Sequence, residues 1–383
     1  MDRTDMTERD FPREEFERRW TRAQELMARD GLDALFVTEK TNYRYFTGHQ
    51  TLQFNNKQRP MTVLIPREGQ PVMMIYGLEA EVARNETWVA DVRGYVDVPF
   101  PVSLVTDTLN DLGLSGGRIG CELGDNQRLW MSHRDFEAIR AALPGARFVD
   151  ASETLVACRI VKSQLEIERI ETACRLTEEA WTLVQQRVRP GMSVRDAERI
   201  CFEALVEAGS DPSGPGFVLL DVLGFGTGHR YAAGDLFFCD FGGTFGGYRA
   251  DFARMATFGP ASAELRQAHS DICGIIDAVI GAMRPGVTCR DIAETCNREL
   301  QKLGLPRLQG SKRIGHGCGI EFQEPPSLNA VDLTVLQPGM VLTPEPRFVR
   351  DGRFIMVEED VVITETGARR LSHGCERLYE IGL

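Results

Sequence analysis

Residues 189–209 read RPGMSVRDAERICFEALVEAG and residues 284–304 read RPGVTCRDIAETCNRELQKLG, so the chain repeats itself without gaps at an offset of 95 residues. In each copy a Pro-Gly pair ends a preceding helix, Ser193 or Thr288 can cap the next helix, and an aspartate follows three residues later. Each copy therefore predicts helix, turn and helix, and strand-rich segments follow it. The repeat indicates two related α+β halves in a pseudo-twofold arrangement, with strands of both halves facing a central site.

The length of 383 residues exceeds one compact core, so we expect two domains with a boundary near residue 155. In residues 1–155 helical and strand patterns alternate, and the apolar runs LDALFVT, MTVLIP, PVMMIYG and RIGCEL predict an α/β domain with a mostly buried sheet. Residues 156–383 contain the repeat and are expected to form an α+β domain. An amphipathic stretch at residues 158–181 predicts one long helix where this domain begins.

Composition restricts the class of protein. The net charge is −12 and no basic tract is present, so a nucleic-acid partner is not expected. No apolar run reaches the ~18 residues of a membrane helix, and the charged N-terminus lacks the apolar core of a signal peptide. Ten cysteines without a CxxC pair are typical of buried, reduced thiols, so we expect a cytoplasmic location.

Two aspartates in the first half, Asp240 and Asp251, flank a glycine-rich hairpin, GGTFGG. The segment reads as strand, turn and strand, so the two carboxylates can come together from neighbouring strands. Acidic residues inside apolar strands are costly to bury unless a positive group neutralises them. That group is either a cation or the guanidinium of Arg249 or Arg254, and these residues alone leave the choice open.

Three residues of the second half favour the cation. His316 is flanked by glycines, which let the backbone approach a site closely. Glu345 and Glu358 lie in predicted strands, 105 and 107 residues after Asp240 and Asp251, so the acidic pairs occupy roughly equivalent places in the two repeats. Four carboxylates and one imidazole suit two divalent ions. Oxygen-rich coordination favours manganese, cobalt or iron, and zinc remains possible.

The order of these residues resembles the pita-bread metallopeptidase family. The pattern is an aspartate, ten intervening residues, a second aspartate, a glycine-flanked histidine, a glutamate in GMVLTPEP and a glutamate in VEEDVVIT. The family includes methionine aminopeptidase, aminopeptidase P, prolidase and the metal-free creatinase. The resemblance implies a pita-bread catalytic domain over about residues 160–383. Residues 1–155 look like the extra domain of the aminopeptidase P, prolidase and creatinase branch.

The resemblance also implies roles for individual residues. Asp240 would bind the first metal, Asp251 and Glu358 would bridge both, and His316 and Glu345 would bind the second. A bridging hydroxide would attack a carbonyl that a metal polarises, and Glu345 would handle its proton.

The EED run leaves two registers for the last ligand. Glu358 is preferred to Glu359 because six residues separate it from Thr364, as in the strand of the family.

The chain departs from the family pattern at several positions. Peptidases of the family usually have a second histidine seven residues after the histidine ligand, and Gln323 stands there. Glutamine can donate a hydrogen bond to a carbonyl or an oxyanion, but it cannot carry a proton on and off. His229 is either a displaced counterpart of an upstream catalytic histidine or a loop residue. Met356 replaces a common arginine; His373 could compensate for it or lie at the surface.

Two classes of function fit this pattern, with Glu345, His229 and Gln323 as candidate catalytic residues. The first is a metal-dependent hydrolase, an Xaa-Pro aminopeptidase or dipeptidase. The second is a non-peptidase member of the fold, either a small-molecule C–N hydrolase resembling creatinase or ectoine hydrolase, or a metal-dependent lyase. A non-catalytic binding protein is a third reading, which the complete ligand set disfavours. The expected partners are a small peptide or small amide substrate and, from the resemblance to prolidase-like proteins, a second copy in a homodimer.

Overall fold

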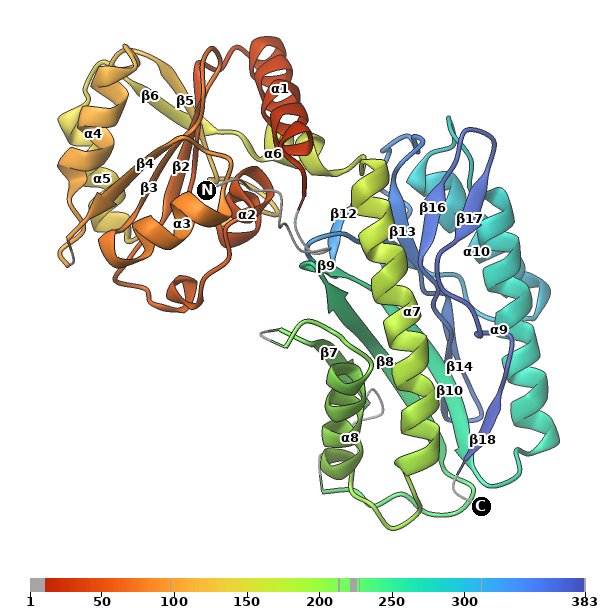
Figure 1. Cartoon of the computed structure of the whole chain (residues 1–383). Helices are drawn as coiled ribbons and strands as arrows, with labels where there is room; N and C mark the ends of the chain where they lie inside the picture. The colour runs from red at the N-terminus through yellow and green to blue at the C-terminus, as the bar shows by residue number, and fades with distance from the viewer. Residues whose placement is uncertain are drawn as a thin grey trace. The chain divides into compact units, whose positions relative to one another are not determined.

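The computed structural model describes residues 11–96, 98–212, 214–220, 226, 228–310 and 312–381. The chain divides into two compact units, Met1–Arg159 and Ile160–Leu383 (Figure 1). Each unit has its own sheets and its own apolar core. Among the described helices, none is both long enough and apolar enough to cross a membrane.

Unit 1 is built on one six-stranded sheet in the order β4-β3-β2-β1-β5-β6. The central strands pair antiparallel, β1 with β2 and β2 with β3, while β1–β5, β3–β4 and β5–β6 are parallel. The four apolar runs form β1, β2, β3 and β5, as predicted. The elements are α1 (Arg13–Asp30), β1 (Ala34–Val37), α2 (Lys40–Thr47), η2 (Leu52–Asn55), β2 (Thr62–Pro66), β3 (Val72–Tyr76), η3 (Gly77–Glu79), α3 (Ala80–Glu86), β4 (Asp91–Tyr95), α4 (Val102–Asp111), β5 (Arg118–Cys121), α5 (His133–Ala142), β6 (Arg147–Asp150) and α6 (Ser152–Arg159).

Unit 2 contains two five-stranded sheets and a two-stranded ribbon. The first sheet has the order β18-β10-β8-β7 with β9 on β8, and the second has the order β12-β11-β13-β16-β17. Its elements are α7 (Gln164–Arg187), α8 (Val194–Glu207), β7 (Gly216–Leu219), β8 (Leu236–Phe245), β9 (Tyr248–Arg249), β10 (Phe252–Phe258), α9 (Ala263–Ala282), α10 (Cys289–Lys302), β11 (Gly315–Gly317), β12 (Glu324–Ser327), β13 (Val341–Pro344), β14 (Arg347–Arg350), β15 (Arg353–Met356), β16 (Val361–Ile363), β17 (Ala368–Arg370) and β18 (Tyr379–Ile381).

The internal repeat appears as two equivalent helix pairs, α7–α8 and α9–α10. Ser193 and Thr288 each cap the second helix, and each forms a reciprocal capping box with the aspartate three residues later. Both cap residues also form an isolated antiparallel bridge, Ser193 with Arg230 and Thr288 with Val335. The expected helix–turn–helix units and the α+β class are confirmed.

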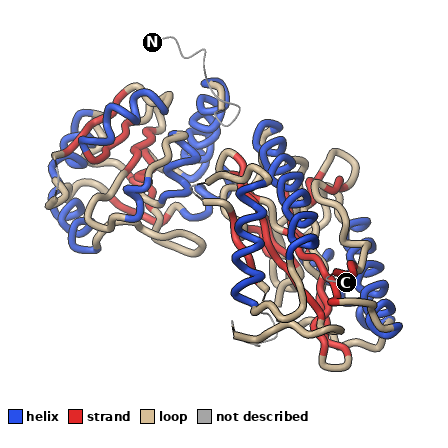
Figure 2. Tube along the Cα trace, turned by 60° about the horizontal axis from the view of Figure 1, so that its bottom comes forward, coloured by secondary structure: helices blue, strands red, loops and turns tan. Residues whose placement is uncertain are grey.

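Each helix pair covers a sheet of its own half. α7 packs on β8, while α9 packs on β13 and β15. Figure 2 shows the long helices of unit 2 running alongside its strands. The helices thus bury the apolar face of each sheet, and the opposite faces of the two sheets are free to carry the polar side chains of a site between the halves.

The single helix expected over residues 158–181 is wrong in one respect. α6 ends at Arg159 and α7 begins at Gln164. Ser163 and Glu166 form a capping box that starts a new helix, which interrupts the amphipathic pattern.

Candidate functional site

Asp240 and Asp251 lie on one face of the first sheet. Asp240 is in β8 and its antiparallel partner is Ala253 in β10. Directly paired residues point to the same face, and side chains alternate along a strand, so Asp251, two residues before Ala253, shares the face of Asp240. The hairpin therefore brings the two carboxylates together, as the sequence predicts.

His316 enters the site from β11 of the second sheet. Its Nε2 lies 3.5 Å from Asp251 Oδ2. Its Nδ1 lies 3.0 Å from the carbonyl oxygen of Gly317, and the Thr343 hydroxyl is 3.2 Å from the same nitrogen. A ring that donates from Nδ1 to this carbonyl presents the lone pair of Nε2 to the acidic residues.

The glycine before His316 is required by close backbone packing. Gly315 has φ +148° and a Cβ added there would lie 2.5 Å from the carbonyl oxygen of Thr343. Any side chain at this position would push β11 away from β13, and the imidazole with it.

Glu358 completes a compact group with Asp251 and His316. The three residues each offer a ligand atom, these atoms lie within 4.8 Å of one another, and all three side chains are buried. Glu345 follows β13 and donates its backbone N–H to the carbonyl of Ile314 at 2.8 Å. Arg347 Nη1 holds the Glu345 carboxylate at 2.9 Å, and Arg313 Nε lies 3.6 Å from it.

Burial and mutual repulsion raise the pKa values of the clustered carboxylates. Burial and the charge of Glu345 raise the pKa of Asp240 to about 7. Burial, then the charges of Asp251, Asp240 and Glu345, raise the pKa of Glu358 well above its usual value. Burial lowers the pKa of His316 to about 4, so the imidazole is neutral and able to coordinate.

Two carboxylate oxygens of the group are buried without a partner. Within the described residues, Asp240 Oδ1 and Glu358 Oε2 accept no hydrogen bond. Neither Arg249 nor Arg254, the alternatives to a cation, pairs with Asp240 or Asp251 in the described part of the chain: Arg249 donates to the carbonyl of Ile320 at 3.1 Å, and Arg254 pairs with Glu359. Buried carboxylates with free oxygens and a neutral imidazole fit divalent cations.

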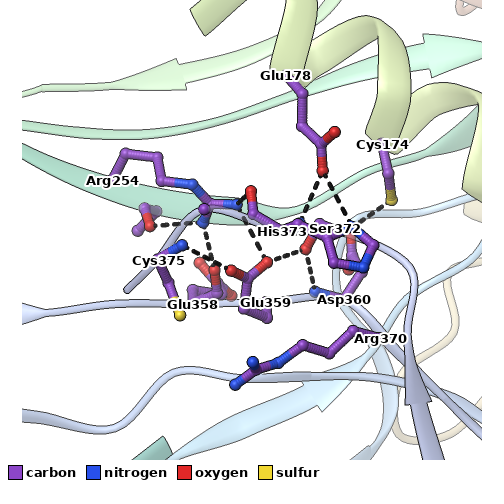
Figure 3. Close-up of polar contacts among 12 residues, drawn as sticks. Cys174, Glu178, Arg254, Glu358, Glu359, Asp360, Arg370, Ser372, His373 and Cys375 are labelled. Carbon is purple, nitrogen blue, oxygen red and sulfur yellow. Dashed lines mark hydrogen bonds and ion pairs between the residues drawn. The ribbon is translucent and has the colours of Figure 1, made fainter. Parts of the chain in front are cut away.

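Glu359 points to a different set of partners (Figure 3). Its Oε2 lies 3.1 Å from Arg254 Nη2 and accepts a hydrogen bond from Ser372, and its Oε1 accepts the Cys375 N–H at 2.9 Å. Burial alone would raise the pKa of Glu359, but these partners lower it. Both carboxylate oxygens of Glu359 therefore have protein partners, whereas Glu358 Oε2 has none within the described residues.

Two further residues support the site: Arg254, which the sequence suggested as a partner of the aspartates and which contacts the glutamates instead, and Asp360, which sequence reasoning missed. Arg254, 1% exposed, donates to the carbonyl of Glu358 at 2.9 Å in addition to pairing with Glu359. Asp360 accepts the backbone N–H of Asp251 at 2.8 Å and the Cys174 thiol at 3.2 Å. The only signal for Asp360 was its place after two glutamates in a predicted strand.

The remaining candidates lie outside the compact group. Gln323 is exposed and directly precedes β12. The first residue of that strand, Glu324, is buried and lies 3.2 Å from Lys162 Nζ. His229 Nε2 lies 3.5 Å from Asp235 Oδ2. Asp235 precedes β8 by one residue, roughly 16 Å along the strand from Asp240, so the structure does not bring His229 to the cluster.

His373 and Met356 do not supply the missing arginine. The His373 side chain is 69% exposed beside Glu178, and only its backbone carbonyl reaches Arg254, at 2.6 Å. Met356 is buried in the apolar core of unit 2.

The chain is similar in sequence and fold to known metallopeptidases. Residues 168–365 match the metallopeptidase family M24, and residues 19–161 match the creatinase/prolidase N-terminal domain. The Bacillus subtilis (strain 168) protein YkvY, which carries the provisional name of a dipeptidase, is 29% identical to this chain over 352 residues. The match covers 89% of this chain and 94% of that protein. The ectoine hydrolase of Halomonas elongata is 26% identical over 402 residues, covering 96% and 98%. The crystal structure of an X-Pro aminopeptidase from Thermotoga maritima shares the fold with a TM-score of 0.80 at 24% identity, covering 94% of this chain and 99% of that one.

Proposed function

We propose, because the chain belongs to metallopeptidase family M24, that it is a metal-dependent hydrolase of Xaa-Pro dipeptides or short Xaa-Pro peptides. The observation that carries the proposal is the buried group of Asp251, His316 and Glu358, whose ligand atoms lie within 4.8 Å of one another. Their burial favours a cation as the group that neutralises them. The oxygens of Asp240 and Glu358 that accept no hydrogen bond within the described residues support the same conclusion. The match of residues 19–161 to the creatinase/prolidase N-terminal domain favours the prolidase type.

Five residues would hold two divalent ions. Asp240 would bind one ion, His316 and Glu345 the other, and Asp251 and Glu358 would bridge them. Manganese, cobalt or iron suits this oxygen-rich set, and zinc is the remaining candidate. Bound there, the ions would polarise the scissile carbonyl and acidify water.

Protein residues around the ions would transfer a proton, hold a metal ligand in place and orient the substrate. Burial raises the pKa of Glu345, while Arg347 and Arg313 oppose the rise, so this carboxylate accepts a proton more readily than an ordinary glutamate, as a proton-transfer role requires. Asp360 would fix Asp251 through its backbone N–H. Gln323 would hold a substrate oxygen with its amide, since it cannot shuttle a proton.

A second candidate is a small-molecule C–N hydrolase. Gln323 in place of the usual histidine removes a proton-transfer group of the peptidases, and the ectoine hydrolase of Halomonas elongata aligns with 96% of this chain. A metal-dependent lyase belongs to the same second class, because it would use the same ligands. A non-catalytic binding protein is less favoured, because the cluster has the complete ligand set and, within the described residues, buried carboxylate oxygens without hydrogen-bond partners.

A substrate panel tests these alternatives. Manganese-loaded protein is assayed against Xaa-Pro dipeptides, longer Xaa-Pro peptides, creatine, ectoine and related amides. Glu345→Ala serves as the blank, and Glu365→Ala, an exposed glutamate beyond β16, serves as the matched control. The proposal expects Xaa-Pro hydrolysis that the blank loses and the control keeps. Turnover of a small amide alone, lost in the blank, would move the protein to the second candidate.

The proposal includes a homodimer and a cytoplasmic location. Support for the location is chemical: all ten cysteines are free thiols, which persist in a reducing compartment. Support for the dimer is the prolidase-type domain pair. Light scattering should give about twice the chain mass of 42.8 kDa, and a value near the chain mass would remove the dimer from the proposal.

A further inference from the structure

Cys273 and Cys375 form a thiol pair outside the metal centre. Cys273 lies on α9, and Cys375 lies in the segment between β17 and β18. The Cys273 thiol donates to the carbonyl oxygen of Cys375, with the sulfur 3.2 Å from that oxygen, so the side chain of Cys273 contacts the residue that carries the second thiol. Of the ten cysteines, all in the described part of the chain, Cys273 is the one that is partly exposed.

A histidine one helical turn away makes Cys273 the reactive partner. Both ring nitrogens of His269 lie close to the Cys273 Sγ, at 3.7 and 3.8 Å, as expected for positions four residues apart on a helix. The neighbouring Cys375 side chain, aided by His269 and opposed by burial, lowers the pKa of Cys273 to about 6. The neighbouring Cys273 side chain and burial raise the pKa of Cys375. The pair thus has one partly exposed nucleophile and one buried thiol beside it.

We propose that Cys273 and Cys375 are a redox-sensitive pair, which a hydroperoxide converts into an intramolecular disulfide. The Cys273 thiolate attacks a peroxide oxygen, the O–O bond breaks, and Cys273 becomes a sulfenic acid while the other oxygen leaves as hydroxide or alkoxide. The Cys375 sulfur then attacks the Cys273 sulfur, the S–O bond breaks, and water leaves with the Cys375 proton. Two thiols lose two electrons in total and the peroxide gains them.

The disulfide would form next to the residues that hold Glu358 and Glu359 in place. The Cys375 N–H donates to Glu359, which pairs with Arg254, and Arg254 donates to the carbonyl of Glu358. Figure 3 shows Cys375 beside Glu359 and Arg254. A covalent link from Cys375 to α9 would therefore act on the loop that holds Glu359 in place.

The protein contains its own comparison pair. Cys201 and Cys239 have their sulfurs 3.9 Å apart, but both are buried, and burial with the neighbouring thiol raises the pKa of Cys239 well above its usual value. Both pairs bring two cysteines into contact, but partial exposure and a histidine neighbour distinguish Cys273. We expect Cys201 and Cys239 to stay reduced in the folded protein.

The test counts thiols in the full chain. Wild-type protein is treated with a small molar excess of hydrogen peroxide, denatured in iodoacetamide, and analysed by intact mass and peptide mapping. Two of the ten thiols should escape alkylation, in a cross-linked peptide joining Cys273 to Cys375, and dithiothreitol should restore both. The wild-type map requires no variant, so folding of a variant does not decide this result.

Variants assign the two steps. Cys375→Ser should stop at a dimedone-reactive Cys273, Cys273→Ser should resist peroxide, and Cys201→Ser should form the wild-type cross-link. His269→Asn should slow oxidation at neutral pH by roughly tenfold or more, because less Cys273 is thiolate. Ten alkylated thiols after peroxide, a cross-link between Cys201 and Cys239, or oxidation that dithiothreitol does not reverse would overturn the proposal.

Discussion

Two adjacent glutamates differ in whether their oxygens have protein partners. Glu358 keeps a buried oxygen without a hydrogen bond within the described residues, whereas Glu359 is held by Arg254, Ser372 and Cys375. Sequence spacing favoured Glu358 as the ligand, but it gave no sign of the Arg254–Glu359 pair, because these residues are 105 positions apart. A contact of that separation depends on how the two halves fold together, which local patterns do not contain.

The contrast predicts opposite effects of two alanine variants. Glu358→Ala should lose both ions, since the remaining carboxylates would repel one another without a bridge. Glu359→Ala should keep the metal content of the wild type but lose about 3 to 5 kcal/mol of unfolding free energy, because the buried Arg254 charge has lost its partner. Elemental analysis and urea unfolding measure the two effects. Metal retained in Glu358→Ala and lost in Glu359→Ala would show that the register is wrong.

Gln323 gives a second prediction for single residues. If its amide holds a substrate oxygen, Gln323→Ala should lower kcat by about a hundredfold, while Gln323→His, which restores a hydrogen-bond donor, should lower it less. Gln337→Ala removes an exposed glutamine of a turn in the same unit and is the matched control. Steady-state kinetics on the preferred substrate decide the point. Equal turnover of wild type and Gln323→Ala would exclude Gln323 from the reaction.

Elements were predictable where the signal was local. The repeated capping boxes and the apolar runs identified helices and strands because each depends on neighbouring residues. The place of β18 was not predictable: three residues at the C-terminus pair in parallel with β10 of the first half, Tyr379 opposite Ala256. So short a strand has no periodicity of its own, and its pairing is set by the rest of the sheet.

The capping boxes predict matched effects in both halves. Ser193→Ala and Thr288→Ala each remove the acceptor of the N–H of an aspartate, Asp196 or Asp291, and each should cost about 1 kcal/mol in urea unfolding. Thr182→Ala, an exposed site within α7, should change the unfolding free energy by less than about half as much. A loss in one half without a loss in the other would contradict the equivalence of the two caps.

At the scale of the whole molecule, the acidic centre should make stability depend on pH once metal is stripped. The folded pKa of Asp240 and that of Asp360 are raised to about 7, mainly by burial, from a usual 3.8. Between these values the folded chain keeps protons that the unfolded chain has lost, so stability falls as pH rises through the folded pKa. His316, lowered by burial from 6.5 to about 4, acts in the opposite direction but is one group against several carboxylates.

We therefore expect the midpoint of thermal unfolding of chelator-stripped protein to fall from about pH 5 to about pH 7. Manganese should raise the midpoint more at the higher pH, because ions and protons compete for the same carboxylates. Asp240→Asn, which cannot titrate at this position, should show a shallower fall. A midpoint that rises over this range in stripped wild-type protein would contradict the expected excess of protons in the folded state.

Metal content and hydrolysis, measured on the same samples, test the central claim most directly. Stripped protein is titrated with manganese, bound metal is determined by elemental analysis after removal of free ion, and cleavage of an Xaa-Pro dipeptide is followed in each sample. The account predicts no cleavage in stripped protein and a rate that rises with bound metal and levels off at about two ions per chain. Full cleavage at negligible metal content would contradict it.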